Sequence, residues 1–429
     1  MQTADIALIS RLINKAFMAE IIPFRAVRPT RDKVHLVATR SYVTYQPRHL
    51  NRKLLENPFS FVHIINPEFG KSRKSRPNSD TRFNKIKQRF EEFCDDKILA
   101  QDEKDAFYVY RQITPTHSFT GIICGVAVKE YTEGHIKIHE QTLTSRVGVF
   151  TKYLDICDFN AEPVLLTYTD KGTHIDPLIA KSMSARPEYD FTTTDRIQHQ
   201  LWLIDNKEDI AAVQKEFAKL ECLYIADGHH RMASSALLGE KRMKRKGWKP
   251  TDISNYALAL ILPEKELNIR PFHRVIRLDE PIDEKQLLKD LESHFKITKK
   301  SRTYFPKANH EFGMRISKGW YSLKLKDKMV SEKVVEHLDP MILTNTILEP
   351  LFDIHDQKTD RRIQFIPGKE SIDKYEKSID QGLTTALFTL HSTSTAQLFA
   401  VSDANEIMPP KSTYVEPKLR SGLTIMKLS

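Results

Sequence analysis

The stretch Tyr224–Ala233 (YIADGHHRMA) constrains the fold of this chain more than any other. The apolar residues Leu223–Ala226 just before the charged positions predict a short buried strand, and the small and apolar residues Met232–Leu238 predict a buried helix. Five polar or glycine positions, Asp227–Arg231, separate the two. The stretch therefore predicts a strand-to-helix corner that carries polar side chains.

Such a corner suits an anion, because the first amides of a helix lack internal partners and lie at the positive end of its dipole. Gly228 allows the backbone to approach a ligand. His229 and His230 can donate to phosphate or move protons, and Arg231 can bind a phosphate or carboxylate. Asp227 can orient a histidine, accept a proton or help to hold a metal. The alternative is structural: Asp227 caps the helix, Gly228 makes the turn and the basic side chains are solvated.

A zinc site is not expected at the corner. Neighbouring histidines on a helix diverge by about 100°, and the sequence has neither Cys-x-x-Cys nor His-Glu-x-x-His. The four cysteines are far apart in the sequence and match no metal-binding or disulfide spacing, as expected for a protein of a reducing compartment. No run of about 18 apolar residues occurs, and Met1–Phe17 lacks the pattern of a signal peptide. We therefore expect a cytoplasmic protein without a membrane segment.

The net charge of +10 comes from 66 basic and 56 acidic residues that are mixed along the chain, which suits an anionic metabolite at least as well as nucleic acid. The densest basic run, Lys241–Lys249, includes Trp248 and could bind nucleic acid, but we favour the solvated end of a helix. With 429 residues and 40% hydrophobic content, the chain is expected to be globular. Patterning predicts helices at residues 82–93 and 210–220, strands at 106–111, 119–128, 163–168, 199–204 and 256–262, and a loop at 71–80.

Three further segments carry side chains that are candidates for binding an anionic ligand. The alternation in His135–His139 predicts a strand with two histidines and a lysine on one face, and Glu140 follows at its end. The turn Arg270–Arg274 contributes His273 and Arg274. The proline-stiffened loop Met408–Lys418 presents Lys411, Ser412, Thr413 and Lys418 as donors for a phosphate or carboxylate. The structural alternatives are an exposed strand end for Glu140 and a surface turn for the loop.

Six segments along the chain form a recognisable set: Pro23–Pro29, Asn57–Phe61, Ile138–Glu140, Asp227–Arg231, Pro271–Val275 and Met408–Lys418. In this set the chain resembles a bacterial and archaeal protein family, domain of unknown function 1015. The chain departs from the family pattern at Ala38–Tyr42 and at Val415, which predicts a subgroup with its own substrate preference.

The corner is also similar to the motif of free-serine kinases in the ParB and sulfiredoxin-like superfamily. That resemblance implies phosphoryl transfer to or from a small amino acid, with serine or O-phosphoserine as the substrate. Our own role assignment is a hypothesis: Arg231, Lys411 and Lys418 hold the phosphate or carboxylate, and the hydroxyls of Ser412 and Thr413 add hydrogen bonds. One of the corner histidines would donate to the leaving oxygen, and Glu140 or Asp227 would activate water. His139 and His273 are further candidates for proton transfer.

The sequence contains neither Gly-x-x-x-x-Gly-Lys nor Gly-x-Gly-x-x-Gly, so no familiar nucleotide-binding loop is present. We therefore favour hydrolysis of O-phosphoserine, a reaction that needs no nucleotide and can use Mg²⁺. A serine kinase using ADP or ATP is the alternative, and a non-enzymatic ParB-like protein that binds nucleotide or DNA is the third. The oligomeric state is open.

The expected fold is mixed α/β to α+β, with a ParB-like core and terminal extensions packed on it. The expected regions are 1–155, 156–280 with the corner, and 281–429 with the proline-rich loop.

Overall fold

The computed structural model describes residues 19–41 and 45–429. Two sequence features lie outside this range: the segment Met1–Phe17, which lacks the pattern of a signal peptide, and Tyr42, the last residue of the stretch Ala38–Tyr42 that departs from the family pattern. The chain forms two compact units. Unit 1 contains the described residues up to 137, residues 141–267 and residues 417–429; unit 2 contains residues 138–140 and 268–416.

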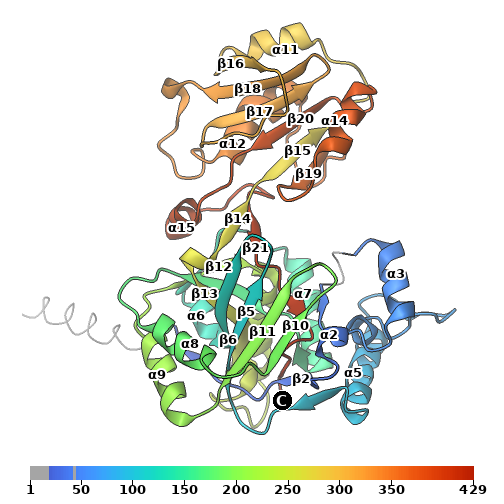
Figure 1. Ribbon diagram of the computed structural model, residues 1–429, viewed down its shortest axis with the longest axis vertical. Helices are drawn as coiled ribbons and strands as arrows, with labels where there is room; N and C mark the ends of the chain where they lie inside the picture. Colours follow the sequence, from blue (N-terminus) through green and yellow to red (C-terminus); the bar gives the residue numbers. More distant parts are fainter. Residues whose placement is uncertain (1–18, 42–44) are drawn as a thin grey trace, which may run out of the picture. The chain divides into compact units, whose positions relative to one another are not determined.

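Unit 1 is built on a nine-stranded mixed sheet (Figure 1). Its main path runs β10-β11-β5-β6-β13-β9-β12-β7, and β1 pairs with β6. The pairs β13–β9 and β12–β7 are parallel and the others are antiparallel. In path order the strands are Tyr189–Thr192, Gln198–Ile204, Phe107–Ile113, Ser118–Ala127, Tyr256–Pro263, Val164–Tyr168, Leu223–Asp227 and Ile136–Lys137, with β1 at Ile21–Ile22.

Helices of unit 1 pack on this sheet and on one another. The helix α10 (His229–Met243) contacts β9, β13, α6 and α7. Its small residues permit this close packing: a Cβ on Gly239 would lie 3.0 Å from a methyl carbon of Val128 and 3.1 Å from the carbonyl oxygen of Ser254. The other helices are α2 Val34–Val37, α3 Pro47–Glu56, α4 Val62–Ile65, α5 Asp80–Asp95, α6 Val128–Thr132, α7 Thr144–Cys157, α8 Ile175–Met183 and α9 Lys207–Phe217.

The helix α5 shows how local sequence determines a boundary. The Ser79 hydroxyl accepts a hydrogen bond from the Arg82 amide and caps the first turn. Buried aromatic and aliphatic side chains then recur at helical spacing and join a core cluster with Phe159 and Ile425. These side chains are Phe83, Ile86, Phe90 and Phe93.

The last segment of the sequence completes unit 1 through short pairings. Strand β22 (Arg420–Ser421) pairs with β3 (Thr39–Arg40), and β23 (Met426–Lys427) pairs with β8 (Phe159–Asn160). Between them, Ile425 exchanges backbone hydrogen bonds with Val27 in β2. Strand β2 (Val27–Pro29) also pairs with β4 (Leu99–Gln101).

Unit 2 contains a six-stranded antiparallel sheet in the order β16-β18-β17-β20-β15-β19. In that order the strands are Phe295–Lys300, Gly319–Leu325, Glu311–Ile316, Ala386–Leu390, Phe272–Ile276 and Ile363–Pro367. A separate pair joins β14 (Asn268–Arg270) to β21 (Tyr414–Glu416). The helices are α11 Glu284–Leu291, α12 Asp339–Leu343, a π-helix Thr344–Leu348, α13 Glu349–Phe352, α14 Asp373–Asp380 and α15 Thr395–Asp403.

The mixed α/β class expected from the sequence is confirmed. Every predicted strand and helix before residue 263 overlaps an observed element, including the strand-to-helix corner. The strand predicted over His135–His139 is shorter, because β7 ends at Lys137. Among the described residues, no helix is both long and apolar enough to cross a membrane.

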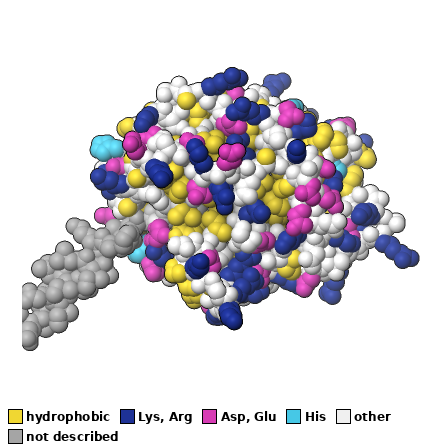
Figure 2. Space-filling model, turned by 90° about the horizontal axis from the view of Figure 1, so that it is seen from below, with side chains coloured by type: hydrophobic (Ala, Val, Ile, Leu, Met, Phe, Trp, Pro, Cys, Tyr) yellow, Lys and Arg dark blue, Asp and Glu magenta, His cyan; other side chains and the backbone are white. Residues whose placement is uncertain are grey.

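The basic run Lys241–Lys249 begins in the last turn of α10, and four of its six cationic side chains form ion pairs within unit 1. Asp155 accepts from Lys241, Arg242 and Arg245 at 2.8, 3.1 and 2.5 Å. Arg242 is buried and also contacts Asp158. These pairings favour the helix-end interpretation over a nucleic-acid patch. On the face seen in Figure 2, cationic and anionic side chains are likewise intermingled.

Candidate functional site

The corner is shaped by an irregularity at the end of β12. Strand β12 pairs with β9 in register at Ile225, but the register shifts before Asp227, which lies opposite Leu165. Such a bulge re-aims the side chains beside it. Gly228 then turns the chain with φ 105° and ψ 30°, and α10 begins at His229. The first intrahelical hydrogen bond runs from the Met232 amide to the Gly228 carbonyl.

Asp227 lies between two cations. Its Oδ2 atom accepts a hydrogen bond from Lys418 Nζ at 3.1 Å and lies 3.6 Å from Arg231 Nη2. Desolvation acts to raise the pKa of Asp227, but the charges of Lys418 and Arg231 outweigh it and lower the pKa to about 2. About two fifths of the Asp227 and Lys418 side chains stay exposed (41% and 40%), so a ligand can reach both. The corner thus presents an ionised carboxylate beside an accessible ammonium.

Arg231 turns back toward the start of its helix. Its Nη1 atom donates to the carbonyl oxygen of Pro163, the residue before β9. The guanidinium lies against Gly228, where a Cβ atom would approach Arg231 Nε to 2.8 Å. Glycine is therefore needed here both for the positive φ and for the space that Arg231 occupies. Pro163 was not predicted as a site residue, because a carbonyl acceptor leaves no signal in a sequence.

The two corner histidines differ in environment. His229 is 3% exposed and faces the interior. His230 is partly exposed, and its Nε2 atom accepts a hydrogen bond from the Leu143 amide at 3.1 Å. An accepting Nε2 places the proton of the neutral ring on Nδ1. Desolvation, with the charge of Arg146 adding to it, lowers the pKa of His230 below 6.5, so the ring is neutral at pH 7. His230 thus orders the segment that leads into α7 and keeps an N–H at Nδ1.

Residues 408–416 of the proline-rich loop belong to unit 2, and its last two residues belong to unit 1. Lys411 is exposed, has φ 57°, and its Nζ atom lies 5.5 Å from the Phe272 ring centroid. Ser412 is buried, and its hydroxyl donates to the Pro409 carbonyl at 2.7 Å, which closes the loop on itself. Thr413 is partly buried and precedes β21. Of the three, Lys411 is the side chain that the loop presents to solvent.

His273 and Arg274 lie on β15 and are both buried. His273 Nδ1 accepts from the Leu390 amide at 3.2 Å, and desolvation with the charge of Arg274 lowers the pKa of His273 to about 4. Arg274 donates to the carbonyl oxygens of Phe272 and Lys411, and desolvation lowers its pKa to about 9. Arg274 therefore supports the backbone of the proline-rich loop.

His139 and Glu140 follow β7 in a bend and are grouped with unit 2. His139 is 3% exposed, and its carbonyl accepts from the Met408 amide at 2.9 Å. Glu140 is exposed. The structure therefore brings Asp227, Gly228, His230, Arg231 and Lys418 together in unit 1. The assignment of the unit 2 residues to the same site stays a prediction.

A metal at the corner would have one protein carboxylate available. Among residues 19–41 and 45–429, no group of three or more His, Cys, Asp or Glu side chains is placed to hold an ion. Mg²⁺ is often held by one or two carboxylates together with substrate phosphates and water. Asp227 fits the role of that single carboxylate and would leave the other positions to substrate and solvent.

The solved structures that resemble the chain include a free serine kinase in complex with AMP, at 10% identity and a TM-score of 0.36, covering 72% of this chain and 91% of that one. They also include a mutant free serine kinase in complex with ADP, at 11% identity and a TM-score of 0.36, covering 72% and 92%. SbnI from Staphylococcus aureus, truncated at its C-terminus, matches at 12% identity and a TM-score of 0.38, covering 71% and 87%. No curated protein sequence matches the chain. The family model described as "Protein of unknown function (DUF1015)" matches residues 21–341, and the chain belongs to this family.

Proposed function

We propose that the corner catalyses phosphoryl transfer on a small amino acid and, as its main reaction, hydrolyses O-phosphoserine to serine and phosphate. The observation that carries the proposal is the exposed, ionised Asp227 beside Lys418 and Arg231 at the start of a 15-residue helix. Phosphoryl transfer needs positioned cations and an oriented nucleophile more than covalent machinery.

The substrate would bind through its two anionic groups. Lys418 and Arg231 supply cations, and the first amides of α10 supply N–H donors at the positive end of the helix dipole. Phosphate oxygens would compete with Asp227 for Lys418, which is the more accessible of the two cations. The carboxylate of the amino acid would take the remaining donor.

In hydrolysis, a water oxygen attacks phosphorus while the bond from phosphorus to the serine oxygen breaks. Asp227 orients that water by accepting one of its hydrogen bonds, since a carboxylate with a pKa of about 2 is a weak base. The Nδ1–H of His230 donates a hydrogen bond to the leaving serine oxygen, and that oxygen takes up a proton released by the attacking water. The products are serine and hydrogen phosphate.

Serine phosphorylation by a nucleotide is the second candidate. It is favoured by the similarity of residues 227–231 to the free-serine kinase motif, which here lies on a real strand-to-helix corner. In this direction the serine hydroxyl replaces water as the nucleophile, and the leaving group is a nucleotide. The same cations would serve either reaction.

The test measures phosphate release from O-phosphoserine and a panel of other phosphomonoesters, with and without Mg²⁺, and serine phosphorylation with ADP or ATP. Asp227→Asn and Lys418→Met should each lower the rate by about tenfold or more, as expected for a lost charge-assisted contact. Lys427→Met, an exposed lysine in the same terminal segment, is the matched control and should keep full activity.

Nucleotide-independent release that both corner variants lose would support the phosphatase. Turnover only with nucleotide would replace it with the kinase. Activity that survives in folded Asp227→Asn and Lys418→Met proteins would overturn the assignment of the site. Glu140→Gln in the same assay tests the predicted role of the residue in unit 2.

A further inference from the structure

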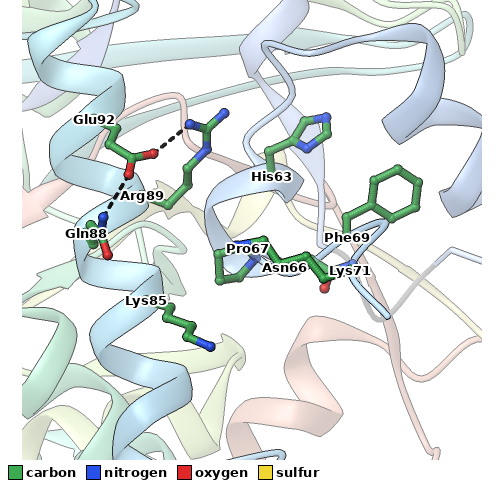
Figure 3. Close-up of a pocket in the computed structure, with 9 residues that line it drawn as sticks. All are labelled: His63, Asn66, Pro67, Phe69, Lys71, Lys85, Gln88, Arg89 and Glu92. Atoms are coloured by element: carbon green, nitrogen blue, oxygen red, sulfur yellow. Dashed lines mark hydrogen bonds and ion pairs between the residues drawn. The ribbon is translucent and has the colours of Figure 1, made fainter. Parts of the chain in front are cut away.

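A cavity of about 350 Å³ lies in unit 1, away from the residues of the corner. Figure 3 shows that Lys85, Gln88, Arg89 and Glu92 reach it from α5, and that the facing wall comes from the segment 63–71. Its lining includes three cationic side chains and one carboxylate. The carboxylate, Glu92, is already bonded to Arg89 at 2.7 Å and to Gln88 at 3.1 Å.

A buried acid holds one wall in place. Glu68 has no exposed side-chain surface and accepts hydrogen bonds from Lys85, Arg82 and Ser75. The hydrogen bond from Lys85, against the opposing effect of desolvation, is the leading cause that lowers the pKa of Glu68 to about 2. Lys85 also donates to Ser75 Oγ at 3.0 Å. These two hydrogen bonds therefore hold the Lys85 ammonium at the cavity wall.

The segment that begins at one lining residue adds positive charge that the fold itself does not neutralise. The cavity residue Lys71 is followed in the sequence by Arg73, Lys74 and Arg76. All four are exposed, and within the described parts of the chain none of their side chains forms an ion pair. Lys71 therefore brings an unpaired cation to the cavity, and such cations raise the local concentration of anions.

Two rings provide the aromatic part of the cavity wall. His63 and Phe69 contact each other edge to face, with 6.1 Å between their centroids. The His63 Nε2 atom lies 3.1 Å from the carbonyl oxygens of Leu54 and Asn57, so it carries the ring proton. Desolvation outweighs the hydrogen bonds to the Asn57 and Leu54 carbonyls and lowers the pKa of His63, so the ring is neutral at pH 7. A planar or sugar-like body can pack on these rings.

We propose that this cavity binds a phosphorylated small molecule, with its phosphate on Lys71, Lys85 and Arg89 and its organic body against Phe69 and His63. The volume lies at the lower end of the range for small-molecule sites, about 300–1,000 Å³, which suits a ligand between a sugar phosphate and a nucleoside monophosphate. Cation, amide and aromatic contacts are those that bind such a ligand. The site is independent of the reaction proposed for the corner.

The experiment is calorimetric titration of the full chain in the Lys418→Met background, which removes the more accessible cation of the corner. The probes are AMP, ribose 5-phosphate and inorganic phosphate, with adenosine and ribose as uncharged counterparts. We expect saturable binding of at least one phosphate ester, weakening as salt is raised. The double variant Lys71→Gln, Arg89→Gln should weaken it by about tenfold or more.

Lys87→Gln is the matched control, because it removes one charge from the same helix at a position that does not line the cavity. It should change the affinity less than about twofold. Absence of saturable binding by both esters would overturn the proposal. So would equal affinity in the double variant, or binding of inorganic phosphate alone. None of these results depends on whether the corner releases phosphate.

Discussion

Replacing Gly228 with alanine should destabilise unit 1 through two separable effects. The residue has φ 105°, where an L side chain costs about 1–2 kcal/mol. The new Cβ would also lie 2.8–3.0 Å from three atoms of the Arg231 guanidinium, which must then leave the Pro163 carbonyl. A hydrogen bond from a charged donor contributes about 1.5–3 kcal/mol. The sum predicts a loss of about 2.5–5 kcal/mol in the free energy of unfolding.

The two effects separate in a double-mutant cycle with Arg231→Ala. Once the guanidinium is gone, Gly228→Ala should cost only the backbone part, about 1–2 kcal/mol. The assay is urea unfolding followed by tryptophan fluorescence in a Trp320→Phe background. Trp202 and Trp248 lie in unit 1 and Trp320 lies in unit 2, so the remaining signal reports unit 1. A cost below about 0.5 kcal/mol in the wild-type background, or no difference between the two backgrounds, would refute the reasoning.

Three more outcomes are expected. Lys418→Met should raise the pKa of Asp227 above about 2, because it removes the nearer cation; carboxyl NMR titration would record this, and an unchanged pKa would contradict the pairing. Because the pKa of Asp227 is lower in the folded chain than in the unfolded chain, its ionisation stabilises the fold above a pH of about 4, and this contribution is lost as the pH falls toward about 2. In Lys418→Met, the stability should depend less on pH in this range. His230→Ala should speed hydrogen exchange of the Leu143 amide, and the wild-type amide should stay protected as pH falls through 6.5, since the pKa of His230 is lowered; equal exchange in both proteins would argue against the bond. Arg242→Ala should destabilise unit 1 by about 3–5 kcal/mol in thermal or urea unfolding, because it removes a buried guanidinium that pairs with Asp158 and Asp155. Neutralising an exposed lysine of the same run should have little effect.

The strand-to-helix corner could be predicted because its signals are local. An apolar run, a glycine and a run of small residues each have one common interpretation, and together they place β12 and α10. The orientation of Arg231 could not be predicted in the same way. Its partner is the carbonyl of Pro163, 68 positions earlier, and any residue at that position offers the same acceptor.

The proline-rich loop shows a second limit. Its serine and lysine were predicted as donors for a ligand, and sequence alone gives both the same status. In the structure the Ser412 hydroxyl is used within the loop, while Lys411 is exposed. A hydroxyl can satisfy a nearby carbonyl, whereas an ammonium on a long stem tends to remain in water. Burial decides which candidate is available, and burial depends on packing that is not local.

The discontinuous construction of unit 1 has a consequence for how the protein is made. Lys418, the partner of Asp227, is synthesised after all of residues 268–416. During translation, the corner strand and helix are complete long before their cation emerges from the ribosome. Strands β3 and β8 likewise pair with β22 and β23, which are synthesised last. Domains generally fold as units. Since unit 1 includes residues 417–429, it cannot be completed before all of unit 2 has been synthesised, and the pairing of Lys418 with Asp227 is among the last contacts to form.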